Sequence, residues 1–153
     1  VVFLKGARPC VVIYDELVAS RPVTYQFMLH APRAFAVDEA AGRLRVEQTK
    51  AGVEIAYLAP ESLGFKQTDG FNPPPTREFP NLWHVEAGTR TKRAEIGVTT
   101  VMVPYRAGQS APWTARRSDT SAGIAIEIDL GTEQTTVVFP KPGTDTPVRV
   151  ERR

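Results

Sequence analysis

The chain has 153 residues, with 19 basic and 17 acidic side chains and a formal net charge of +2. This length suits one domain with its own hydrophobic core, and the charge is too small for a nucleic-acid binder that relies on phosphate contacts. No apolar run approaches the roughly 18 residues of a membrane-spanning helix, and a single cysteine, Cys10, excludes an intrachain disulfide. We expect one domain over residues 1–153, with neither nucleic acid nor membrane as a partner. Because the chain starts directly in "VVFLK", we expect it to be a piece of a longer protein.

Apolar and polar residues alternate along most of the chain, as they do in half-buried β-strands. Turn signals built on proline or glycine separate the alternating segments. The strands that we expect, in chain order, cover residues 1–5, 10–19, 23–31, 35–38, 43–49, 53–59, 82–89, 92–106, 113–118, 123–130, 135–139 and 148–151. About ten to twelve strands exceed one comfortable open sheet, so they should form two sheets packed face to face. The predicted fold is all-β: an antiparallel, multi-stranded β-sandwich of the super-sandwich type, with the longest strands, near residues 10–19 and 98–106, at its centre.

Two hairpins stand out in this pattern. Residues 43–49 and 53–59 should pair across a turn at Lys50-Ala51-Gly52, with Leu44 and Val46 facing apolar residues of the second strand. Residues 123–130 and 135–139 should form the other, with Glu127 and Asp129 facing water.

The stretch of residues 61–80 departs from this rhythm. Its segment "FNPPPTREFP" carries four prolines in ten residues and cannot supply hydrogen bonds to a central strand ladder. We therefore predict a long surface loop over residues 61–80, and a second, shorter loop over residues 105–113.

The two histidines are the natural candidates for a functional site. On the strand of residues 23–31, His30 shares a half-polar face with Gln26, opposite an apolar face. Three interpretations of His30 remain open: a hydrogen-bonded structural residue, a residue facing a cleft or partner domain, and a metal ligand. In "LWHVEA", His84 lies on one side of the strand of residues 82–89 and Trp83 on the other. Two interpretations of Trp83 remain open: an exposed indole that stacks on a sugar ring, and a buried indole that packs in a core or against another domain. We select Gln26, His30, Trp83 and His84 as contact residues for a substrate or a neighbouring domain.

Motifs for catalysis are missing from the sequence. No HxH, HExxH or CxxC spacing, no GxSxG nucleophile elbow and no glycine-rich phosphate loop occurs. We therefore predict neither a catalytic residue nor a metal site in this segment. Arg43 and Arg45 should project from one strand face, either into solvent or toward an anionic polymer.

Four local patterns, taken together, carry a family resemblance. The patterns are Ile13-Tyr14-Asp15-Glu16-Leu17, Tyr25-Gln26-Phe27-Met28-Leu29-His30, Trp83-His84 and Met102-Val103-Pro104-Tyr105. With these patterns the chain resembles the carboxy-terminal β-sandwich of the heparinase II/III-like polysaccharide lyases, and the likeness covers roughly its first hundred residues.

The resemblance implies a two-part parent enzyme, an (α/α) toroid followed by the sandwich, that cleaves uronic-acid polysaccharides such as glycosaminoglycans or alginate by β-elimination. In such lyases the catalytic residues come mainly from the helical domain, which this chain lacks, and a structural zinc relies on residues that would lie before Val1. The expected function is thus a largely non-catalytic domain that supports the helical domain and walls the substrate cleft, inactive alone and without a cofactor of its own. Its partners would be the missing helical domain and an acidic polysaccharide, and its location periplasmic or secreted. The alternative is a stand-alone carbohydrate-binding or adhesive β-sandwich module.

Overall fold

The computed structural model describes residues 1–70, Thr76 and residues 82–153. Within these residues the chain forms strands and no helix, so this part holds no helix able to cross a lipid bilayer. The strands are β1 (Val2–Leu4), β2 (Cys10–Val23), β3 (Gln26–Ala31), β4 (Ala36–Asp38), β5 (Arg43–Glu47), β6 (Ala51–Leu58), β7 (Leu63–Thr68), β8 (Trp83–Thr89), β9 (Arg93–Arg106), β10 (Thr114–Thr120), β11 (Gly123–Asp129), β12 (Gln134–Pro140) and β13 (Arg149–Arg152).

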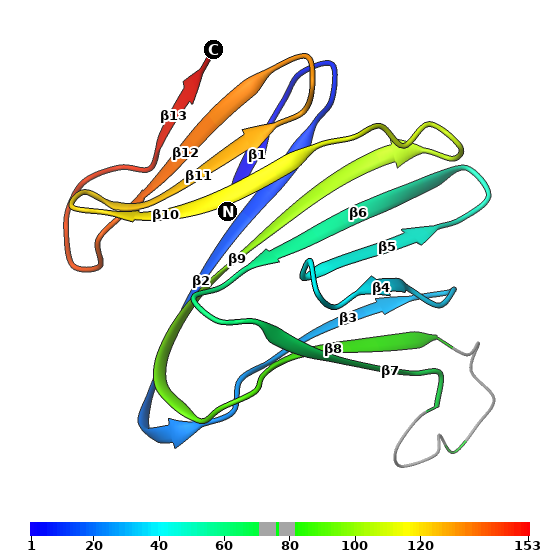
Figure 1. Cartoon of the computed structure of the whole chain (residues 1–153), viewed down its shortest axis with the longest axis horizontal. Helices are drawn as coiled ribbons and strands as arrows, with labels where there is room; N and C mark the ends of the chain where they lie inside the picture. Colours follow the sequence, from blue (N-terminus) through cyan, green and yellow to red (C-terminus); the bar gives the residue numbers. More distant parts are fainter. Residues whose placement is uncertain (71–75, 77–81) are drawn as a thin grey trace. The chain divides into compact units, whose positions relative to one another are not determined.

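The strands form three antiparallel sheets (Figure 1). One sheet has six strands in the order β1-β2-β9-β6-β5-β4, a second has the order β3-β8-β7, and the third has the order β10-β11-β12-β13. The predicted all-β antiparallel sandwich is therefore confirmed, whereas the expectation of two sheets is wrong. β8 pairs with β3 on one side and with β7 on the other, and so it has no edge left to pair with the six-stranded sheet. These three strands therefore form a small sheet of their own.

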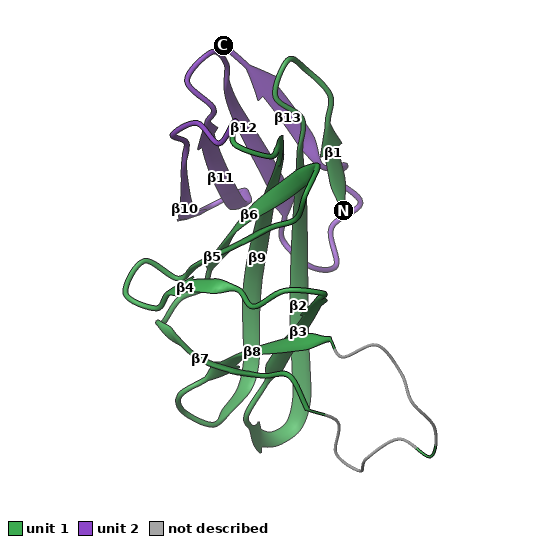
Figure 2. Cartoon of the chain, turned by 90° about the vertical axis from the view of Figure 1, so that its right-hand side faces the viewer, with its two compact units in different colours: residues 1–108 green, residues 109–153 purple. Residues whose placement is uncertain are grey.

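The chain divides into two compact units, residues 1–108 and residues 109–153 (Figure 2). The first unit contains the six-stranded and the three-stranded sheets, and the second contains the four-stranded sheet. The expectation that residues 1–153 form a single domain stays a prediction, because compactness alone does not define what folds independently.

The core of unit 1 lies between its two sheets. Val85 and Ala87 of β8 are fully buried in one cluster with Leu44 of β5, Ile55 of β6 and Val98 of β9. Each fully buried valine, leucine or isoleucine side chain stabilises the fold by about 1.5–3 kcal/mol. Burial of these side chains therefore stabilises the face-to-face packing of the two sheets as layers of a sandwich.

The two longest strands, β2 and β9, lie inside the six-stranded sheet, as the sequence predicts. β9 pairs with β2 along one edge and with β6 along the other. Buried residues follow one another without alternation from Val98 to Val101, which is typical of a strand covered on both faces.

The β5–β6 hairpin forms with Leu44 opposite Ile55 and Val46 opposite Val53, so the predicted facing residues are confirmed. The predicted turn at Lys50-Ala51-Gly52 is wrong: the backbone N–H of Gln48 donates to the carbonyl of Ala51 at 2.8 Å, and the turn lies before Ala51. Gly52 instead belongs to β6, where it pairs with Glu47 of β5 and with Tyr105 of β9.

A Cβ atom at position 52 would come within 2.3 Å of the Tyr105 ring. This glycine therefore serves a close approach between neighbouring strands rather than a turn.

In unit 2 the predicted β11–β12 hairpin is confirmed, with Ile126 opposite Val137 and Glu127 opposite Thr136. Ile126 and Val137 are fully buried, while Glu127 is exposed on the other face. Trp113, just before β10, is only 5% exposed and belongs to the buried side chains.

Candidate functional site

The candidate site is one face of the three-stranded sheet. In β3 the side chains of Phe27 and Leu29 pack against the core of unit 1, while Gln26, Met28 and His30 are exposed. This division confirms the predicted polar and apolar faces of that strand. We call this side of the sheet the His30 face; it consists of the exposed residues Gln26, Met28, His30, Lys66 and Thr68 and the half-buried residues His84 and Glu86.

The strand register brings the two histidines together. His30 lies directly opposite His84 in the β3–β8 pair, and the two imidazole rings meet edge to face with centroids 4.5 Å apart and planes at 89°. Residues opposite each other in an antiparallel pair have Cβ atoms about 4.5–5.5 Å apart, so the contact follows from the register itself.

Gln26 and Glu86 form the polar end of the same face. The Gln26 side-chain amide Nε2 donates to Glu86 Oε1 at 2.7 Å. Glu86 lies between Met28 of β3 and Lys66 of β7. Three of the four residues selected from the sequence, Gln26, His30 and His84, thus share one surface.

Trp83 differs from the other three selected residues. It follows the alternation of β8 on the side of the buried residues Val85 and Ala87, lies opposite the buried Ala31, and is itself half-buried. A contact role for Trp83 stays a prediction. Trp113 is buried, so it offers no exposed platform for a sugar ring.

Strand β7 is the part of the site that the sequence analysis missed. Residues 61–80 were predicted to form one long loop, but Leu63–Thr68 is a strand that pairs with β8. It adds Lys66 and Thr68 to the His30 face, opposite Glu86 and His84. The apolar residues Leu63 and Phe65, two positions apart, are the feature of the sequence that indicates this strand. The proline-rich part of the predicted loop, residues 71–80, lies outside the described residues except for Thr76.

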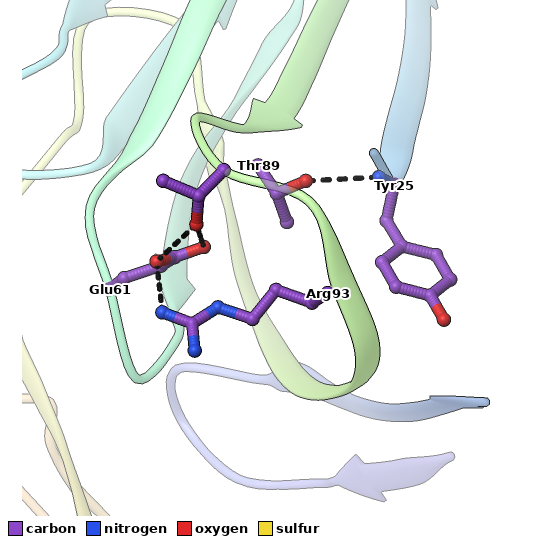
Figure 3. Close-up of polar contacts among 5 residues, drawn as sticks. Tyr25, Glu61, Thr89 and Arg93 are labelled. Atoms are coloured by element: carbon purple, nitrogen blue, oxygen red, sulfur yellow. Dashed lines mark hydrogen bonds and ion pairs between the residues drawn. The ribbon is translucent and has the colours of Figure 1, made fainter. Parts of the chain in front are cut away.

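Hydrogen bonds fix the base of this sheet in place. The Tyr25 backbone N–H donates to Thr89 Oγ1 at 3.0 Å (Figure 3). The Thr89 backbone N–H donates in return to the Tyr25 carbonyl, also at 3.0 Å. Nearby, the Glu61 carboxylate accepts from the Thr91 hydroxyl at 3.2 Å and from the Arg93 guanidinium. The hydrogen bond from Arg93 lowers the pKa of Glu61.

Gln67 links the sheet to the segment between β3 and β4. Its side-chain amide accepts from the Phe35 backbone N–H and donates to the Phe35 carbonyl, both at 3.0 Å. This bidentate contact holds Phe35, which is 4% exposed, in the core below the His30 face.

Chemically, the His30 face offers imidazole, amide, carboxylate and ammonium groups side by side. These groups donate to and accept from hydroxyls and carboxylates, which is the chemistry of binding a polar ligand. Among residues 1–70, 76 and 82–153, no group of three or more His, Cys, Asp and Glu side chains is arranged to hold a metal ion.

The basic pair predicted on β5 is partly neutralised. Arg45 Nε donates to the Tyr105 hydroxyl at 2.8 Å, and the Arg45 guanidinium forms a salt bridge with Glu47 at 3.2 Å. The backbone N–H of Gly108 donates to Glu47 and, with Arg45, lowers the pKa of Glu47. A pocket of about 260 Å³ beside this network is lined by Arg43 and Arg45 but also by Asp38 and Glu54. The pocket therefore has no excess of positive charge for an anionic polymer.

Comparison with known proteins adds no family assignment. No protein-family model matches the chain, and no curated protein matches it.

Proposed function

We propose that this chain is a largely non-catalytic β-sandwich of a heparinase II/III-like polysaccharide lyase, and that its His30 face walls the cleft for an acidic polysaccharide. The all-β antiparallel sandwich agrees with the domain type that the sequence patterns resemble. The observation that carries the proposal is the meeting of the exposed Gln26 and His30 with the half-buried His84 on one sheet face, because two of the resembling patterns supply all three residues.

The composition of the face suits this ligand class. Lys66 and the exposed His30 imidazole interact favourably with uronate carboxylates, and the Gln26–Glu86 pair offers a donor and acceptors to sugar hydroxyls. A face of this kind positions a chain without needing a nucleophile or a base, so it suits a cleft wall. The elimination itself belongs to the helical part of the parent enzyme.

The test is an NMR titration of the chain with two acidic oligosaccharides, a guluronate tetramer and a heparin tetramer. We expect saturable shifts of the backbone amides of β3 and β8, and no rise in ultraviolet absorbance from unsaturated uronides. The variants His30→Ala and Lys66→Ala should weaken binding, whereas Lys5→Ala, which removes an exposed charge outside the three-stranded sheet, should not.

Two results would contradict the proposal. Formation of unsaturated uronides by this chain would show that it carries catalytic residues. Shifts that avoid β3 and β8 with both oligosaccharides would show that the His30 face does not meet the substrate.

A further inference from the structure

One face of the four-stranded sheet in unit 2 carries a second ordered set of polar side chains, within residues 114–153. One row crosses the strands as Arg116, Glu127, Thr136 and Glu151, each directly opposite the next. The adjacent row runs Thr114, Asp129 and Gln134, and reciprocal backbone hydrogen bonds join Gln134 to Arg153.

These rows lie on the polar side of the sheet. Ile126, Ile128 and Val137 alternate with them and are buried on the opposite face. Because side chains alternate strictly along a strand, all members of the two rows project to the same side. Neighbouring rows are two residues apart along a strand, or roughly 7 Å, which brings the polar ends of both rows within reach of one small ligand.

The two rows form a groove rather than a flat surface. It has a volume of about 320 Å³ and is lined chiefly by Thr114, Arg116, Glu127, Asp129, Gln134 and Arg153. This volume is at the lower end of the roughly 300–1,000 Å³ that small-molecule sites occupy.

Part of the lining is held in place before any ligand arrives. Asp129 Oδ1 accepts from the Gly131 backbone N–H at 2.7 Å, and Asp129 Oδ2 accepts from Gln134 Nε2 at 3.1 Å. Preorganised acceptors and donors cost less side-chain entropy on binding than mobile ones. Arg116 and Glu127, although directly opposite, form no salt bridge with each other or with any other described residue, so both remain open to a ligand.

The charges of the lining balance. Arg116 and Arg153 carry two positive charges, and Glu127 and Asp129 carry two negative charges. A polyanion or a polycation would meet as much repulsion as attraction. A neutral ligand rich in hydroxyls suits the lining better, because carboxylates accept from its O–H groups while the guanidinium and amide groups donate to its oxygens.

We propose that this groove is a binding site for a neutral saccharide. The proposal goes beyond the function argued for the His30 face and does not depend on it, since the groove lies wholly in unit 2 and selects a different charge type.

The test is an NMR titration of the full chain with cellohexaose, xylohexaose, mannohexaose and chitohexaose, each to about 10 mM, which is ten times a dissociation constant of about 1 mM. We expect at least one of them to give saturable shifts centred on the amides of β10, β11 and the start of β12. The variants Arg116→Gln and Glu127→Gln should each weaken that binding by about tenfold, as expected for the loss of a hydrogen bond to a charged group.

The matched control is Arg149→Gln, which removes the same charge from an exposed position of β13 that does not line the groove. Circular dichroism checks that each variant keeps its β-sheet spectrum. The proposal is overturned if none of the four hexasaccharides gives saturable shifts, if Arg149→Gln weakens binding as much as Arg116→Gln, or if a guluronate tetramer binds at the groove more tightly than the neutral sugars.

Discussion

Gly123, at the start of β11, offers the sharpest test of the strand register in unit 2. Its φ of +138° lies in a region that side-chain-bearing residues rarely adopt, and a Cβ atom there would come within 2.0 Å of the Phe139 carbonyl oxygen and 2.9 Å of Pro140. The neighbouring atoms belong to the backbone of β12, so no side-chain rotation relieves the overlap.

The cost of Gly123→Ala follows from two terms. The unfavourable backbone conformation costs about 1–3 kcal/mol, and separating the end of the β11–β12 ladder to admit the methyl group costs about 1–2 kcal/mol in backbone hydrogen bonds. The sum is a loss of about 2–5 kcal/mol in the free energy of unfolding.

Gly131→Ala is the matched control. Gly131 has a φ of +84° but no atom within 4 Å of an added Cβ, so this variant carries the backbone cost alone, about 1–2 kcal/mol. Urea denaturation followed by circular dichroism and by the fluorescence of the buried Trp113 measures both variants. Equal destabilisation by the two substitutions would refute the close approach of β11 to the β12 backbone.

Three further predictions concern unit 1. Burial, and after it the negative charge of Asp15, raises the pKa of Tyr57 to about 12. Stability should therefore fall as pH rises from about 10 to 12, by about 3 kcal/mol in all, and urea titrations of Tyr57→Phe should lack this loss. Gln67→Ala should cost about 2 kcal/mol, because it leaves the buried backbone groups of Phe35 without two hydrogen bonds, and the Phe35 amide should then exchange faster; unchanged exchange would contradict this. Because Arg93 lowers the pKa of Glu61, their contact stabilises the fold above the ordinary glutamate pKa, and this stabilisation is lost as pH falls. The melting temperature of Glu61→Gln should therefore fall less on acidification than that of the unchanged protein. An equal fall in both proteins would contradict the contact.

Alternation of apolar and polar residues is a local property, which is why it predicted most strands and their faces. The alternation of Phe27 and Leu29 with His30 is readable from the sequence, and in the structure the first two are half-buried against the core while the third is exposed. β7 was not predicted because the prolines that follow it indicate a loop. Leu63 and Phe65 nevertheless alternate with Gly64 and Lys66, as apolar residues do in a half-buried strand.

Gly52 shows the kind of feature that no local pattern reveals. A glycine after lysine and alanine reads as a turn residue, yet its neighbour in space is Tyr105, more than fifty positions away in the sequence, whose ring fills the place of a side chain. The hairpin was predicted correctly and its turn was misplaced, because the reason for the glycine lies on another strand.

The same distinction governs both candidate surfaces. Sequence periodicity places His30 and His84 on the exposed sides of their own strands, and likewise Glu127 and Asp129, but it does not say which residue of another strand lies opposite. Sliding β3 by two residues against β8 would keep every side chain on its face and yet place Met28 rather than His30 opposite His84. A binding surface on a sheet is therefore set by the register, and the register depends on long-range contacts such as the Tyr25–Thr89 backbone pair and the Gln67–Phe35 clamp. We therefore expect mutations of Thr89 and Gln67, whose side chains make these contacts, to alter the binding proposed for the His30 face although neither residue belongs to that face.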